Sequence, residues 1–299
     1  MRFLKEPTAT ERRTLVWAGV LLSGAGAAGV ALARAGYGLP PVWAIIVLGM
    51  VATIAERQSV ALTDRTTMSV SSLPLVFSAV VFGPLGGFAV GVLSNTWDIK
   101  TSRLKWAVYT PVRGLTAAAA GLAVVQAVPH ASGFGQYLLA SLIASLANLL
   151  SDGFFNAATA AIRRVSVAEV LRAVGSLCVL TVPLYVPLVA LFVYGYHAYS
   201  LRVVLVFFVP ALAAQRLLHL YQEERVASRR LATANARLRS ANLSFATALV
   251  ATLDARDRYT AGHSAAVATY ARDIAARMGL SESEQELAHL CGLVHDVGK

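Results

Sequence analysis

Charged residues are scarce in this 299-residue chain, and the scarcity is uneven. Asp, Glu, Lys and Arg make up 14% of the residues, against about 25% in average soluble domains. The deficit falls in residues 14–220, which hold nearly all the long apolar runs, whereas residues 221–299 have the composition of ordinary soluble helices. This composition excludes a single soluble globule and predicts a membrane domain followed by a water-soluble segment.

Acidic residues and cysteines are the scarcest of the reactive types. The chain has 16 Asp and Glu against 26 Lys and Arg, a net charge of +10. Residues 221–299 contain ten basic and nine acidic residues, so the basic excess lies beside the apolar runs. Loops on the cytoplasmic side of a membrane have this bias, and we therefore exclude a nucleic-acid polymer as a partner. Cys178 and Cys291 have neither metal-ligand nor disulfide spacing, and we interpret them as packing residues.

Long apolar runs dominate the first 220 residues. A helix needs about 20 apolar residues to cross the hydrocarbon core of a bilayer. The predicted spans are residues 14–33, 42–55, 106–128, 134–162, 174–196 and 201–220. A further apolar stretch at residues 73–95 is interrupted by Gly83-Pro84-Leu85-Gly86-Gly87. We assign residues 1–220 to an all-α, multi-span membrane sensor domain.

Basic loop residues indicate how the interrupted stretch is built. Lys100, Arg103 and Lys105 follow it, and a single crossing would place them on the outer side. A hairpin of two short helices returns the chain to the cytoplasmic side. We predict six full spans plus this short or re-entrant hairpin, in the inner membrane of a bacterial cell with both termini cytoplasmic. Seven or eight plain spans are the alternative. Irregular backbone at membrane depth must be buried in protein or line a cavity, so the hairpin is a candidate wall of a ligand cavity.

Polar residues inside the predicted spans form a second candidate feature. Asn148, Asp152 and Asn156 recur every four residues and share one helix face, and Arg113 lies in the neighbouring span. Charges at membrane depth usually face the interior of a helix bundle. We predict an Arg113–Asp152 pair, which either lies near a signal-binding cavity or fixes helix packing.

Residues 221–245 have the pattern of a coiled-coil signalling linker. Leu231, Leu238 and Phe245 are seven residues apart, and alanines repeat with the same spacing three residues later. This is an a/d heptad pattern. It predicts a parallel homodimer that carries motion from the membrane to the C-terminal segment. The alternative is a helix that packs on its own domain.

Residues 246–299 predict three further helices, the last of which ends in His295-Asp296. Ser281 and Glu284 have capping-box spacing at the start of the third helix, and His263 begins the second helix. An adjacent imidazole and carboxylate can bind one cation, and a carboxylate can bridge two ions. A two-metal site clamps phosphate oxygens and supplies a hydroxide nucleophile. The segment therefore predicts a metal-dependent hydrolase.

The C-terminal motifs resemble the start of an HD-GYP domain, a branch of the HD phosphohydrolases. The resemblance rests on Asp257-Arg258-Tyr259-Thr260-Ala261-Gly262-His263-Ser264 and, about thirty residues later, Leu293-Val294-His295-Asp296-Val297-Gly298-Lys299. It covers about 50 residues and implies the start of an all-α domain that hydrolyses cyclic di-GMP, a cyclic dinucleotide, to the linear dinucleotide or to GMP.

The resemblance also implies roles for individual residues. His263 and His295 are similar to the first two metal ligands of the family, and Asp296 resembles the carboxylate that bridges the metals. Lys299 is expected to contact the substrate phosphate. Family members with three metals have a Glu where this chain has Tyr259, which favours two divalent ions. These ligand types do not distinguish Fe, Mn, Ni and Zn.

The family's remaining ligands and its Gly-Tyr-Pro loop would follow Lys299, so we expect the 299 residues alone to be catalytically inactive. Two alternatives remain open at this point. The first is another HD-type nucleotide phosphohydrolase. The second is a membrane receptor or small-molecule binding module with a non-catalytic output.

Overall fold

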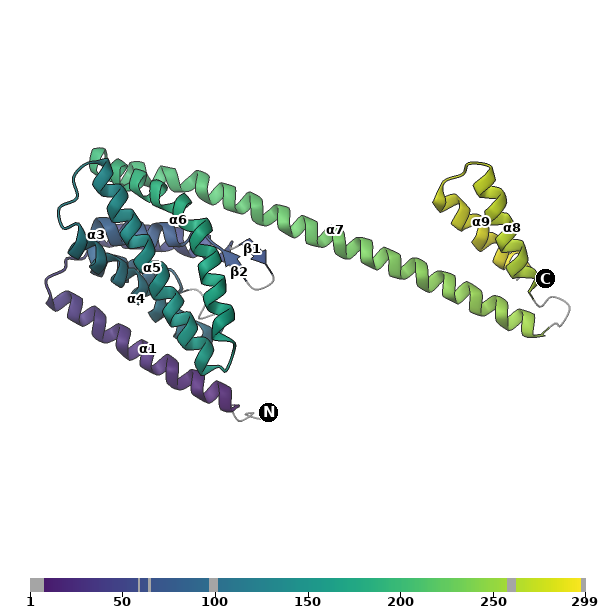
Figure 1. The fold of residues 1–299 in the computed structure, drawn as a ribbon, viewed down its shortest axis with the longest axis horizontal. Coiled ribbons are helices and arrows are strands. Elements are labelled where there is room, and N and C mark those ends of the chain that lie inside the picture. The colour runs from purple at the N-terminus through teal and green to yellow at the C-terminus, as the bar shows by residue number, and fades with distance from the viewer. Residues whose placement is uncertain (1–7, 59, 64–65, 97–101, 257–261, 297–299) are drawn as a thin grey trace. The chain divides into compact units, whose positions relative to one another are not determined.

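The computed structural model describes residues 8–58, 60–63, 66–96, 102–256 and 262–296. These residues are predominantly helical, which confirms the predicted fold class. The elements are α1 (Ala9–Arg34), α2 (Val42–Arg57), β1 (Val60–Thr63), β2 (Thr66–Met68), α3 (Ser72–Leu93), α4 (Arg103–Ala127), α5 (Phe134–Ile162), α6 (Val167–Ala198), α7 (Leu201–Arg256), α8 (His263–Arg277) and α9 (Glu282–Val294) (Figure 1). The apolar pattern did not predict the short antiparallel pair β1–β2.

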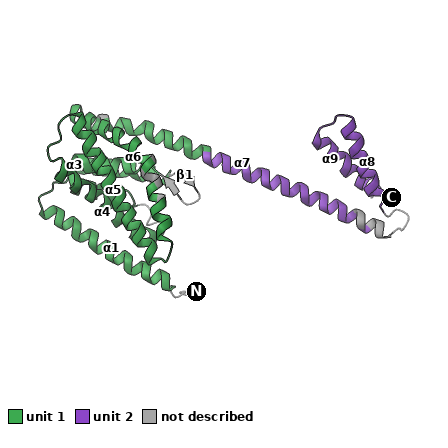
Figure 2. Ribbon diagram, viewed as in Figure 1, with its two compact units in different colours: residues 1–221 green, residues 222–299 purple. Residues whose placement is uncertain are grey.

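The chain divides into two compact units, residues 1–221 and 222–299, and helix α7 contributes to both (Figure 2). Whether the second unit divides into a linker and a domain at residues 245 and 246 stays a prediction. The first unit contains α1 to α6 and the start of α7, and the second contains the rest of α7 with α8 and α9.

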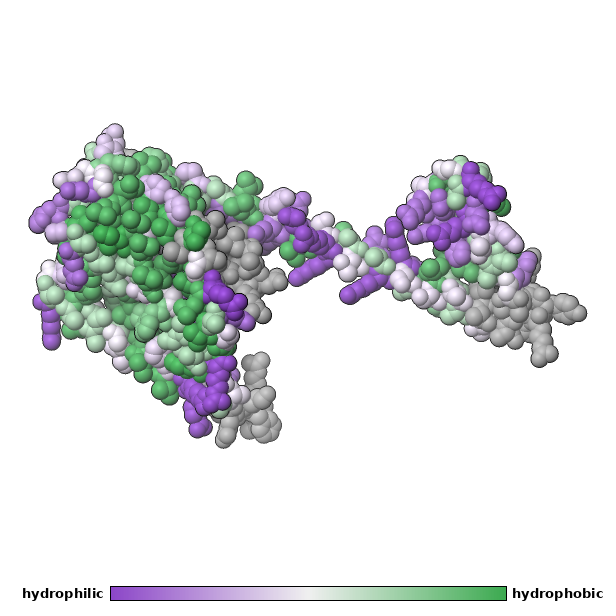
Figure 3. Space-filling view, in the orientation of Figure 1, coloured by the Kyte–Doolittle hydropathy of each residue, from purple (hydrophilic) through white to green (hydrophobic). Residues whose placement is uncertain are grey.

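The surface of the first unit matches a lipid environment. Among the described residues, six helices are long and apolar enough to cross a membrane, namely α1, α3, α4, α5 and parts of α6 and α7. Large apolar side chains such as Val16, Met50 and Phe154 are exposed, and apolar residues cover much of the visible face (Figure 3). Soluble monomers rarely expose apolar patches of this extent. Lipid chains would cover these side chains.

Helix α3 is long enough to span a membrane, but its backbone reverses direction at Gly83. Gly83 has φ +71° and ψ −168°, a conformation that favours glycine. A methyl group added at Gly87 would lie 3.1 Å from Cβ of Ala79, whereas residues eight apart in a straight helix are separated by about 12 Å. Helix α3 is therefore a hairpin of two short helices, and the predicted hairpin is confirmed.

The six remaining helices cross the first unit in alternating directions. At one end, which we call the basic end, Trp17 of α1 donates a hydrogen bond to Thr159 of α5, and Ser71 contacts both Glu56 of α2 and Arg113 of α4.

At the opposite end, which we call the tip end, Leu32 packs with Leu85 and Ala118, and Tyr137 stacks on His197. Both ends of the α3 hairpin lie at the basic end, and Gly83 lies at the tip end. The alternative of seven or eight plain spans is therefore wrong.

Helix α2 crosses this unit with 16 residues, which corresponds to a length of about 24 Å. This is shorter than the hydrocarbon thickness of about 30 Å, and for this reason α2 does not count among the six helices of spanning length. Its buried residues Ala44, Leu48 and Ala52 pack in the same core as the first half of the hairpin.

Small residues allow the hairpin to lie against α4. A Cβ atom at Gly121 would lie 2.6 Å from Cα of Pro84, and one at Gly91 would lie 2.4 Å from the carbonyl oxygen of Arg113. Close backbone approach at small residues is a common basis of helix association in membranes. It also buries the backbone that directly follows the reversal, from Pro84 to Gly87, as irregular backbone inside a membrane requires.

Substitution of Gly121 by Ala should loosen this contact, because the added methyl group meets backbone atoms that cannot move aside. We expect a loss of about 1–3 kcal/mol in unfolding free energy, as for other overpacked sites. Gly24→Ala in α1 is the matched control, since no atom lies within 4 Å of its added methyl group. Denaturant titration of both variants in detergent measures the difference, and equal stability would contradict the hairpin packing.

Candidate functional site

Helices α8 and α9 pack closely at the C-terminal motifs. Gly292 of α9 lies against Ala268 of α8, where an added methyl group would come within 2.6 Å of Cα of Ala268. Gly262 precedes α8 with φ +84°, a left-handed conformation that suits glycine and sets the direction in which α8 begins. This packing brings the first residue of α8, His263, next to the end of α9, where His295 and Asp296 follow Val294.

The start of α9 is fixed by the predicted capping box. The backbone N–H and the hydroxyl of Ser281 both donate to the Glu284 carboxylate, at 2.8 and 2.7 Å. These hydrogen bonds, from the side chain and then the backbone, lower the pKa of Glu284. The carboxylate therefore stays ionised at neutral pH, close to the positive end of the helix dipole.

His263, His295 and Asp296 form a cluster of potential metal ligands. One ligand atom from each lies within 4.8 Å of the other two, and the two imidazole rings have centroids 5.3 Å apart. Two ligands about 2.1 Å from a shared ion can be at most about 4.2 Å apart, so only a small contraction is needed to bind one ion. Lys299 lies outside the described residues.

A backbone contact orients His295 for metal binding. Its Nδ1 lies 2.8 Å from the carbonyl oxygen of Gly292. A carbonyl only accepts, so this contact suits the neutral tautomer with the proton on Nδ1, in which Nε2 is the nitrogen that can bind a metal. Metal-bound histidines usually have this second hydrogen bond. Nε2 also lies 3.2 Å from Oδ2 of Asp296, so both donor atoms face the same point. The donor set fits a first-row divalent ion.

A comparison with protein families finds a match over the residues that contain the ligand cluster. Residues 260–299 match the family model of the HD domain. The match supports the HD superfamily and a metal-dependent phosphohydrolase, and HD domains typically bind divalent metals. No curated protein and no solved structure matches the chain. The six long apolar helices are compatible with a multi-pass membrane protein, and the family match supports a hydrolase of the HD superfamily at residues 260–299.

The predicted pair between Arg113 and Asp152 stays a prediction, and the charge of Arg113 does act on Asp152. Arg113 forms an ion pair with Glu56, and its second guanidinium nitrogen donates to the hydroxyl of Ser71 at 3.1 Å. Asp152 accepts a hydrogen bond from the side chain of Asn156, at 2.9 Å. The pair with Glu56 is possible because both ends of the hairpin lie at the basic end, where Ser71 contacts both the end of α2 and Arg113.

Sequence reasoning missed Glu56, because the second span was ended at Ala55. A usable indication existed: Glu56 is the first acidic residue after Glu11 and directly follows an apolar run. Its carboxylate accepts from Ser71 at 2.6 Å in addition to pairing with Arg113. We call Glu56, Ser71 and Arg113 the polar cluster.

Gln215 of α7 binds backbone groups that lie next to the polar cluster. We call the first unit, residues 1–221, the membrane unit. The side chain of Gln215 is only 5% exposed. The amide nitrogen donates to the carbonyl oxygens of Ala55 and Gln58, at 2.6 and 2.7 Å, and the amide oxygen accepts from the backbone of Val70 at 3.2 Å. Ala55 and Val70 directly precede Glu56 and Ser71, so α7 is bonded to the backbone on both sides of this cluster.

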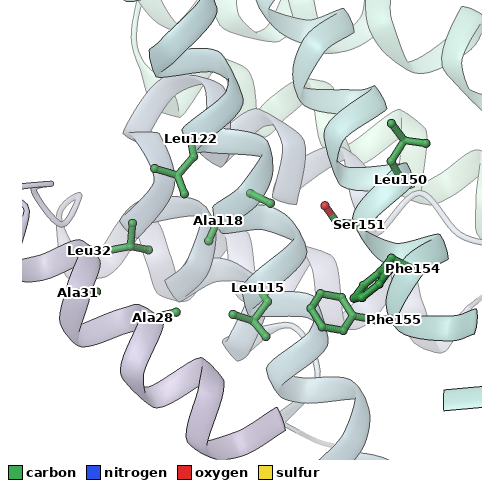
Figure 4. Close-up of a pocket in the computed structure, with 11 residues that line it drawn as sticks. Ala28, Ala31, Leu32, Leu115, Ala118, Leu122, Leu150, Ser151, Phe154 and Phe155 are labelled. Carbon is green, nitrogen blue, oxygen red and sulfur yellow. The ribbon is translucent and has the colours of Figure 1, made fainter. Parts of the chain in front are cut away.

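An apolar groove lies between α1, α4 and α5, with a volume of about 660 Å³ (Figure 4). Leu32, Leu115, Leu122 and Phe154 line it, and Ser151 is its one polar lining residue among those the structure describes. A groove without charged groups suits a lipid chain rather than an ionic ligand.

The ligand cluster predicts that the chain binds a divalent ion and that the binding depends on each histidine. Loss of His295 should weaken Mn²⁺ or Zn²⁺ binding by more than the about 10–100-fold typical for removal of a supporting hydrogen bond. Equilibrium dialysis of His263→Ala and His295→Ala measures this loss. His289→Ala is the matched control, because His289 lies on α9 but outside the cluster. Equal affinity in all three variants would contradict the assignment.

Proposed function

We propose that this protein is a membrane-bound signalling protein whose C-terminal segment belongs to a cyclic di-GMP phosphodiesterase of the HD-GYP type. The observation that carries the proposal is the convergence of His263, His295 and Asp296 within the HD-domain match. The sequence around His263, with Tyr259 and Thr260 four and three residues before it, supports the HD-GYP branch over other HD hydrolases.

The three clustered residues would hold the metal, and each has a distinct task. His295 offers Nε2 because the contact with Gly292 suits the tautomer with the proton on Nδ1, and His263 offers a ring nitrogen from the start of α8. Asp296 supplies the carboxylate that can bridge a second ion. The bound metals would supply a hydroxide nucleophile and neutralise charge on the phosphodiester. Lys299 is assigned to the substrate phosphate by the resemblance alone.

The membrane unit is proposed to be the sensor, in the inner membrane of a bacterium with both termini in the cytoplasm. The basic end supports this orientation, because Arg57, Arg103, Lys105 and Arg163 belong to helix ends or loops there. Cytoplasmic loops are enriched in such residues. The start of α1 and residues 216–221 of α7 belong to the same end.

The linker is proposed to form a parallel homodimer. Leu231, Leu238 and Phe245 remain exposed on α7, with Leu238 65% exposed. Their seven-residue spacing places them on one stripe, and a second copy of the same helix would cover that stripe. Helix α7 would then transmit a change at Gln215 to the hydrolase segment.

Hydrolysis of cyclic di-GMP by the full-length gene product tests the proposed activity. With Mn²⁺ or Fe²⁺, we expect the linear dinucleotide or GMP as product. His295→Ala should reduce the rate at least about 100-fold, because a metal ligand is lost. His289→Ala should keep the activity. Hydrolysis of other nucleotides with no turnover of cyclic di-GMP would contradict the HD-GYP assignment.

Leu238→Asp tests the dimer, because two copies would place like charges opposite each other in the seam. We expect the detergent-solubilised chain to shift from dimer to monomer in sedimentation measurements. Ala236→Asp adds the same charge two residues away on the outer face of the helix and should leave the dimer intact. A monomeric wild-type chain, or equal effects of both substitutions, would rule out the linker dimer.

A further inference from the structure

A second cavity, which we call the tip cavity, lies at the tip end of the membrane unit. It has a volume of about 450 Å³ and is formed by the start of α2, the tip of the hairpin, the end of α6 and the start of α7. Its lining includes Pro41, Trp43, Phe82, Tyr196, His197 and Arg202. Small-molecule sites typically measure about 300–1,000 Å³, so the tip cavity has the size of such a site.

Aromatic rings form much of its wall. The rings of Phe82 and Tyr196 meet edge to face with centroids 5.7 Å apart. His197 is held between Tyr196 and Tyr137, on which it stacks at 5.1 Å. Trp43 is 48% exposed, although an indole gains much from burial. A flat aromatic ligand would cover Trp43 and stack between these rings.

The charge of the lining residues determines whether the cavity favours an anionic or a cationic ligand. Arg202 lines the cavity together with His197, and among the described residues no carboxylate lines it. A guanidinium group binds carboxylate and phosphate through two parallel hydrogen bonds, and it repels cations. The apolar groove of Figure 4 lacks such a group and does not share this selectivity.

We propose that the tip cavity binds a small planar aromatic ligand that carries a carboxylate or phosphate group. Arg202 binds the anionic group, and Trp43, Phe82 and Tyr196 hold the aromatic body. The binding site is inferred from the lining residues alone. Its role as the sensory input rests on the proposed function and adds a ligand class to it.

The hairpin connects the tip cavity to the polar cluster. Phe82 directly precedes Gly83 at the hairpin tip, and Ser71 lies at the hairpin base in contact with Glu56 and Arg113. Phe77, in the same short helix, packs against Phe208 of α7 with ring centroids 6.3 Å apart. A ligand against Phe82 therefore contacts the α3 hairpin. The hairpin packs on α7 through Phe77, and its base at Ser71 directly follows Val70, which donates to Gln215.

Calorimetric titration of the 299-residue chain in dodecyl maltoside tests the site with three probes of one shape: 2-naphthoate, the corresponding alcohol and the corresponding primary amine. We expect 2-naphthoate to bind most tightly. Arg202→Gln should weaken 2-naphthoate at least about tenfold, in line with the loss of a charge-assisted pair, and leave the alcohol unchanged. Retained alcohol binding shows that the variant is folded.

Arg34→Gln is the matched control, since Arg34 is an exposed arginine in the last turn of α1, at the tip end but outside the cavity lining. Alcohol or amine binding as tight as 2-naphthoate, or an Arg34→Gln effect equal to that of Arg202→Gln, would overturn the proposal. Added phosphatidylglycerol tests whether a lipid headgroup occupies the cavity instead. Displacement of 2-naphthoate by this lipid, which has no aromatic ring, would overturn the aromatic ligand, and unchanged binding supports it.

This titration does not involve the metal site, so binding should be the same in His295→Ala. If 2-naphthoate binds as expected but the hydrolysis rate of the full-length protein does not respond to any occupant, the sensory function fails and the cavity stands. If hydrolysis occurs and the probes do not discriminate, the cavity fails and the enzyme assignment stands.

Discussion

Backbone polar groups at membrane depth must be paired or buried in protein, and the architecture of the membrane unit follows from this constraint. After the reversal at Gly83, the second half of α3 packs against α4 and the first half of α3, and glycines at positions 87, 91 and 121 allow that approach. With the hairpin in place, both of its ends lie at the basic end. Ser71 then reaches Glu56 and Arg113, and Gln215 reaches the backbone beside them.

Helix α7 is attached to the membrane unit by hydrogen bonds of Gln215 beside the polar cluster. Glu56 and Arg113 are part-buried, and both contact Ser71, so the cluster links the ends of α2 and of the hairpin to α4. Gln215 makes its three hydrogen bonds to backbone groups in the same place. Downstream of Gln215 the same helix continues to Arg256, and most of its described side chains are exposed.

The sequence predicted features that depend on local pattern and missed those that depend on tertiary proximity. Apolar length and the Gly-Pro break predicted the spans and the hairpin, and the spacing of Ser281 and Glu284 predicted the cap of α9. The ion pair of Arg113 with Glu56 depends on where the hairpin base lies, which no periodicity encodes. The same holds for the tip cavity, whose lining comes from four separate helices. His263 and His295 could be paired from their motifs, but their common orientation depends on the Gly292–Ala268 contact.

The hydrolase assignment depends on whether the imidazoles of α8 and α9 share a metal ion. X-ray absorption at the metal edge of the Mn- or Zn-loaded protein measures this directly. We predict imidazole nitrogen at about 2.0–2.2 Å together with carboxylate oxygen, and one imidazole fewer per metal in His263→Ala. A shell of oxygen ligands alone, unchanged in that variant, would show that the metal binds elsewhere and would contradict a metal-dependent hydrolase built on this cluster.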